Sequence, residues 1–132
     1  MDSSDRKSRR DEFDDLLRDA IEKLPPEVRR LVDEVPIIVD DEPWPELLRE
    51  MNLPVSSESD LCGLHWGIPL NEKSSMSDQP DTPRIHLFRG PIVRLAGSNR
   101  RELKRQIQIT LIHEIGHLFG LTEERLAELG YE

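Results

Sequence analysis

The chain contains a single cysteine, Cys62, among its 132 residues. One thiol cannot form an internal disulfide, and it excludes a zinc site built from a cluster of cysteines. Long apolar runs are also missing: no stretch approaches the roughly 20 residues of a membrane-spanning helix. The first residues are polar and lack the apolar core of a secretory signal. We therefore expect a soluble protein of a reducing compartment, with a cytoplasmic location.

Positive charge is scarce, because 18 Lys and Arg stand against 27 Asp and Glu and the net charge is -9. A surface this acidic repels nucleic-acid phosphates and anionic lipid, so we expect neither nucleic acid nor a membrane as a partner. The length fits one domain. Residues 1–10 are polar and charged and predict a disordered tail. Residues 11–132 are then expected to form a single domain.

The apolar pattern predicts helices near both ends of the chain and short strands between them. Residues 13–24 carry apolar side chains at three- and four-residue spacing, which is typical of an amphipathic helix that ends at Pro25. A short helix is expected at 27–34 and one or two helical turns at 45–51. Strands are expected at 35–39, 61–70 and 84–88, with a loop at 71–83, a turn at 90–91 and a short extended or turn-like piece at 92–95.

From Asn99 onward the sequence predicts one long helix. Asn99 is a good N-cap, and Glu102 three residues later can reach back to it as in a capping box. Gly120 suits the left-handed residue that ends many helices. Apolar residues recur at helical spacing and predict a buried stripe, formed by Leu103, Ile107, Leu111, Ile115 and Leu118.

This helix carries two histidines at the spacing of a zinc site. His113 and His117 are four residues apart, so their imidazoles lie on one face and can share a tetrahedral zinc ion with bonds near ~2.0 Å. Glu114 is rotated by ~100° about the helix axis, from where it can take a proton from a water that the ion activates. We predict zinc as the cofactor, His113 and His117 as ligands and Glu114 as the general base. The alternative is a set of polar residues without a metal.

An ion held by two histidines needs at least one more protein ligand. Gly120 allows the chain to reverse, and Glu123 follows six residues after His117. Thr122 equally fits an N-cap of a last helix, in which an acidic first turn is favoured by the helix dipole alone. We predict Glu123 as the third ligand, so that its loss weakens metal binding more than loss of Glu124.

Other residues could complete the site in place of Glu123. Glu124 and Glu128 are the remaining candidate carboxylates in this part of the chain. His65 and His86 are lone histidines near predicted strands, and we interpret them as surface or core residues rather than ligands. Residues 65–66, beside two glycines, could line a cleft.

The segment 109–130, with His-Glu-Ile-Gly-His-Leu-Phe-Gly-Leu-Thr-Glu at 113–123, resembles the small bacterial zincin-like metallopeptidase family. Residues 35–43 and 85–91 are similar to that family's early strand and to the strand before its metal helix. The resemblance implies a minimal zincin-like α+β domain, with a small sheet packed on the active-site helix and N-terminal helices. It also implies His113 and His117 as metal ligands, Glu114 as base and Glu123 in the acidic third-ligand place.

The resemblance implies a zinc-dependent metallopeptidase that hydrolyses a peptide or protein substrate with Glu114 as the base. Larger long-motif zinc proteases place a methionine turn after the motif, whereas no methionine follows Met76 here. Tyr131 is the only Tyr or His after the motif that could stabilise an oxyanion. The alternative function is therefore a catalytically inactive zincin-fold module that binds metal or peptides. A further alternative is a small helical regulator in which the motif is incidental.

Overall fold

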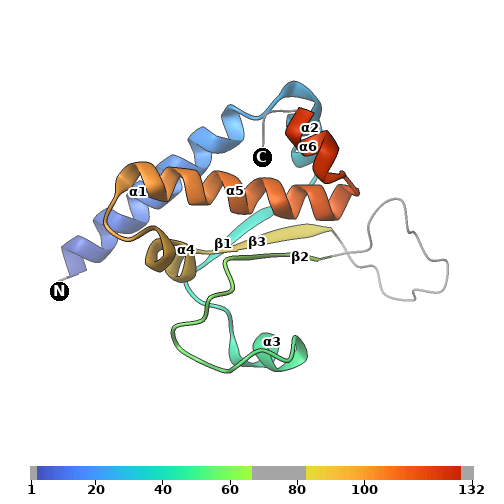
Figure 1. Cartoon of the computed structure of the whole chain (residues 1–132). Helices are drawn as coiled ribbons and strands as arrows, with labels where there is room; N and C mark the ends of the chain where they lie inside the picture. The colour runs from blue at the N-terminus through green and yellow to red at the C-terminus, as the bar shows by residue number, and fades with distance from the viewer. Residues whose placement is uncertain (1–2, 67–82, 129–132) are drawn as a thin grey trace.

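The computed structural model describes residues 3–66 and 83–128, and their side chains from residue 10 onward. Its helices are α1 (Ser3–Glu22), α2 (Pro26–Val32), α3 (Pro45–Glu50), α4 (Arg89–Ala96), α5 (Arg100–Phe119) and α6 (Glu123–Glu128), and its strands are β1 (Ile37–Asp40), β2 (Gly63–Trp66) and β3 (Arg84–Phe88). Helices α5 and α1 lie over one face of the sheet and α3 lies on the other side (Figure 1). The fold is α+β, as the sequence predicts.

The sheet has the strand order β1-β3-β2, with β1 parallel and β2 antiparallel to β3. Successive side chains of a strand point to opposite faces. Ile85 and Leu87 of β3 are fully buried in the core shared with α5. The alternate residues His86 and Phe88 contact the Trp44 ring before α3, with centroids 5.7 and 6.2 Å away. The two faces of β3 therefore pack against different elements, α5 on one side and the Trp44 segment before α3 on the other.

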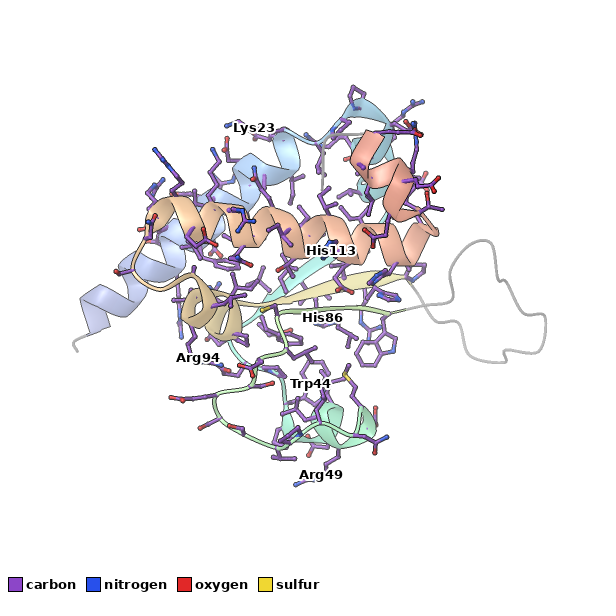
Figure 2. The ribbon with its side chains drawn as sticks, viewed as in Figure 1. Lys23, Trp44, Arg49, His86, Arg94 and His113 are labelled. Atoms are coloured by element: carbon purple, nitrogen blue, oxygen red, sulfur yellow. The ribbon has the colours of Figure 1, made fainter. Side chains whose placement is uncertain are left out.

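His86 forms a buried polar link on the α3 side of the sheet. Its Nδ1 lies 2.8 Å from Oδ2 of Asp40, and its Nε2 accepts a hydrogen bond of 3.1 Å from Nε of Arg84. The Arg84 guanidinium also lies 4.5 Å from the centre of the Trp66 ring. Figure 2 shows His86 and Trp44 on this side, away from His113. His86 is thus a satisfied core residue, as the sequence predicts.

Helix α5 is the centre of the core, and its ends are those that the sequence predicts. The side chain of Asn99 accepts hydrogen bonds from the backbone N–H groups of Arg101 (2.9 Å) and Glu102 (3.2 Å). Gly120 is left-handed, with φ 69° and ψ 28°. The reciprocal half of the capping box is not formed, because Oε1 of Glu102 accepts from Gln106 at 2.8 Å instead.

Two segments differ from the sequence prediction. Residues 90–95, expected as a turn and an extended piece, belong to helix α4. A proline is compatible with a first helical turn, where Pro91 lies, and Ile92 and Ala96 are buried one turn apart. Strand β2 spans four residues of the predicted 61–70, and residues 67–70 and the expected loop at 71–83, apart from Pro83, lie outside the described residues.

The first helix begins at Ser3, so it includes most of the segment predicted as a tail. Its apolar turns from Phe13 onward are buried in the core, whereas residues 3–10 extend the same helix with polar and charged side chains only. The division into a tail at 1–10 and a domain at 11–132 stays a prediction. Within the described residues, no helix is both long and apolar enough to cross a membrane.

Helix α6 packs directly on α5 at Gly116. A Cβ added at Gly116 would lie 3.1 Å from Cδ1 of Leu126, which is buried. The glycine therefore makes room for Leu126 of α6. Thr122 caps α6, because its Oγ1 accepts from the backbone N–H of Arg125 at 3.0 Å.

We predict that Leu111→Ala lowers the free energy of unfolding by about 2–5 kcal/mol, because it removes a fully buried side chain at the centre of α5. Urea denaturation followed by circular dichroism measures the change. Leu95→Ala is the control, since Leu95 is 62% exposed on α4 and its loss should change stability by less than about 0.5 kcal/mol. Equal losses in the two variants would contradict the assigned core.

Candidate metal centre

The two motif histidines lie next to each other on the solvent-accessible face of α5. The His113 and His117 rings are stacked with centroids 6.5 Å apart and planes inclined by 17°. Both residues are exposed, whereas Ile112, Ile115 and Leu118 between and beside them are buried. The helix therefore presents two imidazoles outward while its opposite face holds the core.

Glu114 points from the same helix toward strand β2. Its side chain is only 15% exposed, and its Oε1 lies 3.0 Å from Nδ1 of His65, whose side chain is 27% exposed. A carboxylate accepts hydrogen bonds and cannot donate them, so the proton of this bond is carried by Nδ1 of His65. Glu114 is thus held in one orientation by a residue from another element.

A glycine lets β2 come this close to the helix. A Cβ added at Gly63 would lie 2.7 Å from Cγ2 of Thr110 and 3.2 Å from Cγ of Glu114. The first distance is shorter than any normal contact, and the short Thr110 side chain cannot move away from it freely. The antiparallel register pairs His65 with Ile85, which directs His65 to the α5 side of the sheet.

These contacts bring together three side chains that could hold a metal ion. One ligand atom from each of His65, Glu114 and His117 lies within 4.8 Å of the other two. Imidazole nitrogens and a carboxylate oxygen are common zinc ligands. His113, the other predicted histidine ligand, is not part of this group, although its ring lies 6.5 Å from that of His117. The grouped imidazoles and carboxylate are donors of the kind that the predicted zinc ion takes.

The structure places the predicted ligand Glu123 apart from this cluster. Glu123 is the first residue of α6 and is exposed, and among the described residues it is not grouped with the other three. Its role as a ligand therefore stays a prediction. His65 takes a place at the site that the sequence argument did not give it. The sequence holds only a weak signal for this position of His65, a single histidine between Leu64 and Trp66 in a short predicted strand.

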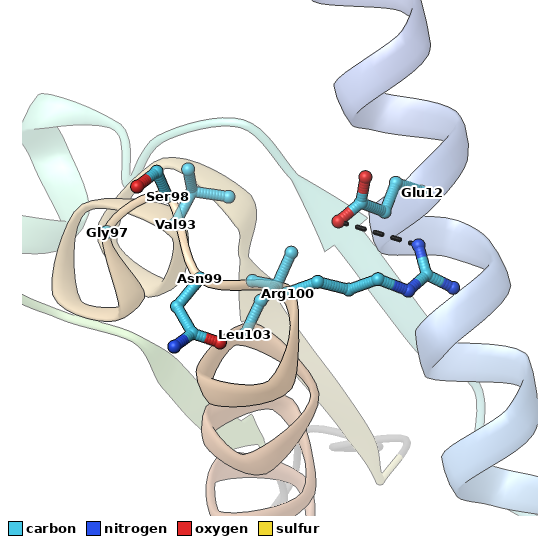
Figure 3. Close-up of a pocket in the computed structure, with 7 residues that line it drawn as sticks. All are labelled: Glu12, Val93, Gly97, Ser98, Asn99, Arg100 and Leu103. Atoms are coloured by element: carbon cyan, nitrogen blue, oxygen red, sulfur yellow. Dashed lines mark ion pairs between the residues drawn. The ribbon is translucent and has the colours of Figure 1, made fainter.

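Two other features do not belong to this centre. Burial, followed by the charge of Asp60, raises the pKa of the Cys62 thiol, so Cys62 is a poor nucleophile at neutral pH. A hollow of about 370 Å³ lies at the opposite end of α5, where Arg100 pairs with Glu12 (Figure 3). Its lining includes Gly97 and Leu103 but none of the motif residues.

The match to a protein family agrees with this geometry. Residues 32–131 match the family model described as zincin-like metallopeptidase, which is well over half of the chain. The chain belongs to the zincin-like metallopeptidase family. A comparison with curated proteins gave no match. Membership implies a metallopeptidase-type fold with zinc as its cofactor, in agreement with the α+β fold and with the imidazoles and carboxylate gathered between α5 and β2.

We predict that the zincin-like protein binds about one equivalent of zinc and that His113→Ala and His117→Ala each abolish stoichiometric binding, because too few donors remain to hold the ion. Elemental analysis after dialysis against a weak chelator measures the content. Arg101→Ala, an exposed change on the first turn of α5, should keep the zinc. Wild-type protein that stays free of zinc after incubation with an excess near neutral pH would contradict the prediction.

Proposed function

We propose that this member of the family is a zinc-dependent peptide hydrolase in which Glu114 is the general base. The observation that supports the proposal best is the position of Glu114. Its carboxylate is largely shielded from solvent, fixed by His65 at 3.0 Å and grouped with the imidazole of His117. A base must be held within reach of the proton that it removes, and a carboxylate held in one orientation beside possible metal ligands supports this role for Glu114.

His113 and His117 would hold the ion, and the sequence expects a third protein ligand at Glu123. When bound, zinc would supply Lewis-acid chemistry, which would polarise the substrate carbonyl and lower the pKa of a water molecule. Glu114 takes a proton from that water as the water oxygen bonds to the carbonyl carbon. Glu114 then gives the proton to the amide nitrogen, and the C–N bond breaks to leave a carboxylic acid and an amine. In these steps Glu114 carries one proton from the water to the amide nitrogen, and no other group of the protein gains or loses an atom.

A second function, a catalytically inactive zincin-fold module that binds metal or peptides, is supported by the residues next to the motif. Residues 118–132 contain no methionine, so these residues do not form a methionine turn. Tyr131, the single Tyr or His after the motif, lies outside the described residues. In this case the site would bind metal or peptide, and Glu114 would not act as a base in hydrolysis.

We predict that Glu114→Gln keeps the fold and the bound zinc but lowers the rate of peptide cleavage by at least about 100-fold, because an amide keeps the shape but cannot accept the proton. The rate is measured with an unfolded protein substrate, carboxymethylated casein, and one equivalent of zinc. Glu124→Gln removes an exposed acid from α6 and is the matched control with unchanged rate.

Loss of zinc from Glu114→Gln would make Glu114 a ligand and would overturn its role as base. A wild-type protein that binds zinc but cleaves the casein substrate no faster than Glu114→Gln would favour the binding module instead.

A further inference from the structure

His65 lies beside two residues of the motif, Glu114 and His117. The centroids of the His65 and His117 rings are 5.6 Å apart. Two imidazoles that share one tetrahedral zinc with bonds near 2.0–2.1 Å have centroids about 5 Å apart. The centroids of the His113 and His117 rings are 6.5 Å apart. The His117 ring therefore has an imidazole neighbour from α5 and another from β2.

The hydrogen bond of His65 leaves the correct nitrogen free. Nδ1 donates to Oε1 of Glu114, and in the neutral imidazole with this tautomer Nε2 offers a lone pair for a cation. Histidines that bind zinc commonly donate their other ring N–H to a carboxylate, which fixes the tautomer and raises the basicity of the ligand. The His65–Glu114 pair has this arrangement.

We propose that His65, rather than Glu123, supplies the third protein ligand, so that the ion is held by the imidazoles of His65, His113 and His117. The proposal rests on the zinc binding assumed in the proposed function. Three protein ligands leave a fourth position for water, as in catalytic zinc sites with three histidines, whereas a fourth protein ligand would close the site. Oε2 of Glu114 stays available as the base while Oε1 is held by His65.

The rest of the fold supports this choice. His65 is presented by a strand that is paired to β3 through its whole length and that approaches α5 closely at Gly63. Glu123 is on the exposed first turn of a six-residue helix, which is held in place by the Leu126 contact with Gly116 and by the ion pair of Arg125 with Glu27. The third ligand is therefore provided by strand β2, which packs against the metal helix at Gly63.

The test counts the imidazoles on the ion. Full-length protein loaded with one equivalent of zinc is studied by zinc-edge X-ray absorption, in which imidazole gives a characteristic scattering pattern. We expect three imidazoles in the wild type and in Glu123→Ala, and two in His65→Ala. Competition with a chromogenic chelator should show at least a 100-fold weaker zinc affinity for His65→Ala and less than a threefold change for Glu123→Ala. Circular dichroism checks that each variant is folded.

The possible failures are distinct. Two imidazoles in the wild type, with an affinity that depends on Glu123 and not on His65, would overturn this proposal and leave the zinc hydrolase proposal intact. An unchanged imidazole count in His65→Ala would do the same, even if the affinity fell, because His65 would then act only through Glu114. Wild-type protein that binds no zinc at all would overturn both proposals.

Discussion

The burial of one face of helix α5 between α1 and the sheet is the interaction on which the rest of the structure depends. Ile107, Leu111 and Ile115 on that face are fully buried. Each buried aliphatic side chain contributes about 1.5–3 kcal/mol from the removal of apolar surface from water. The position of α5 is therefore fixed by the core, and with it the positions of the polar residues on its other face, His113 and His117.

The site depends on a second constraint, the close approach of β2 to this polar face. Strand β2 is at the edge of the sheet and is anchored by its pairing with β3. Gly63 removes the side chain that would separate it from Thr110 and Glu114. The hydrogen bond of His65 to Glu114 follows from this approach. Helix packing thus places the motif residues, and the close approach at Gly63 brings His65 into contact with Glu114.

The parts that could be predicted from the sequence are governed by local interactions. The span and caps of α5 follow from helical periodicity, the Asn99 side chain and the left-handed Gly120, and all three are confirmed. Helix α4 was missed because Gly90 and Pro91 favour a turn in isolation, whereas burial of Ile92 and Ala96 favours the helix in the folded chain.

The site could be predicted only where it lies within one helix. The spacing of His113, Glu114 and His117 is a local property, so their common location on α5 was accessible from the sequence. The contact of His65 with Glu114 joins residues 49 positions apart and depends on strand register and on packing at Gly63. Neither is encoded in a short motif, whereas Glu123, the first carboxylate after His117, could be considered from the sequence alone.

The central claim is that a single zinc ion binds at the face of α5 that carries the motif. Anomalous diffraction from a crystal of the zinc-loaded protein, recorded above and below the zinc edge, tests it most directly. The account predicts one strong anomalous peak within ~2.0–2.1 Å of a ring nitrogen of both His113 and His117. The absence of a peak at these two imidazoles, or a single peak elsewhere on the protein, would contradict it.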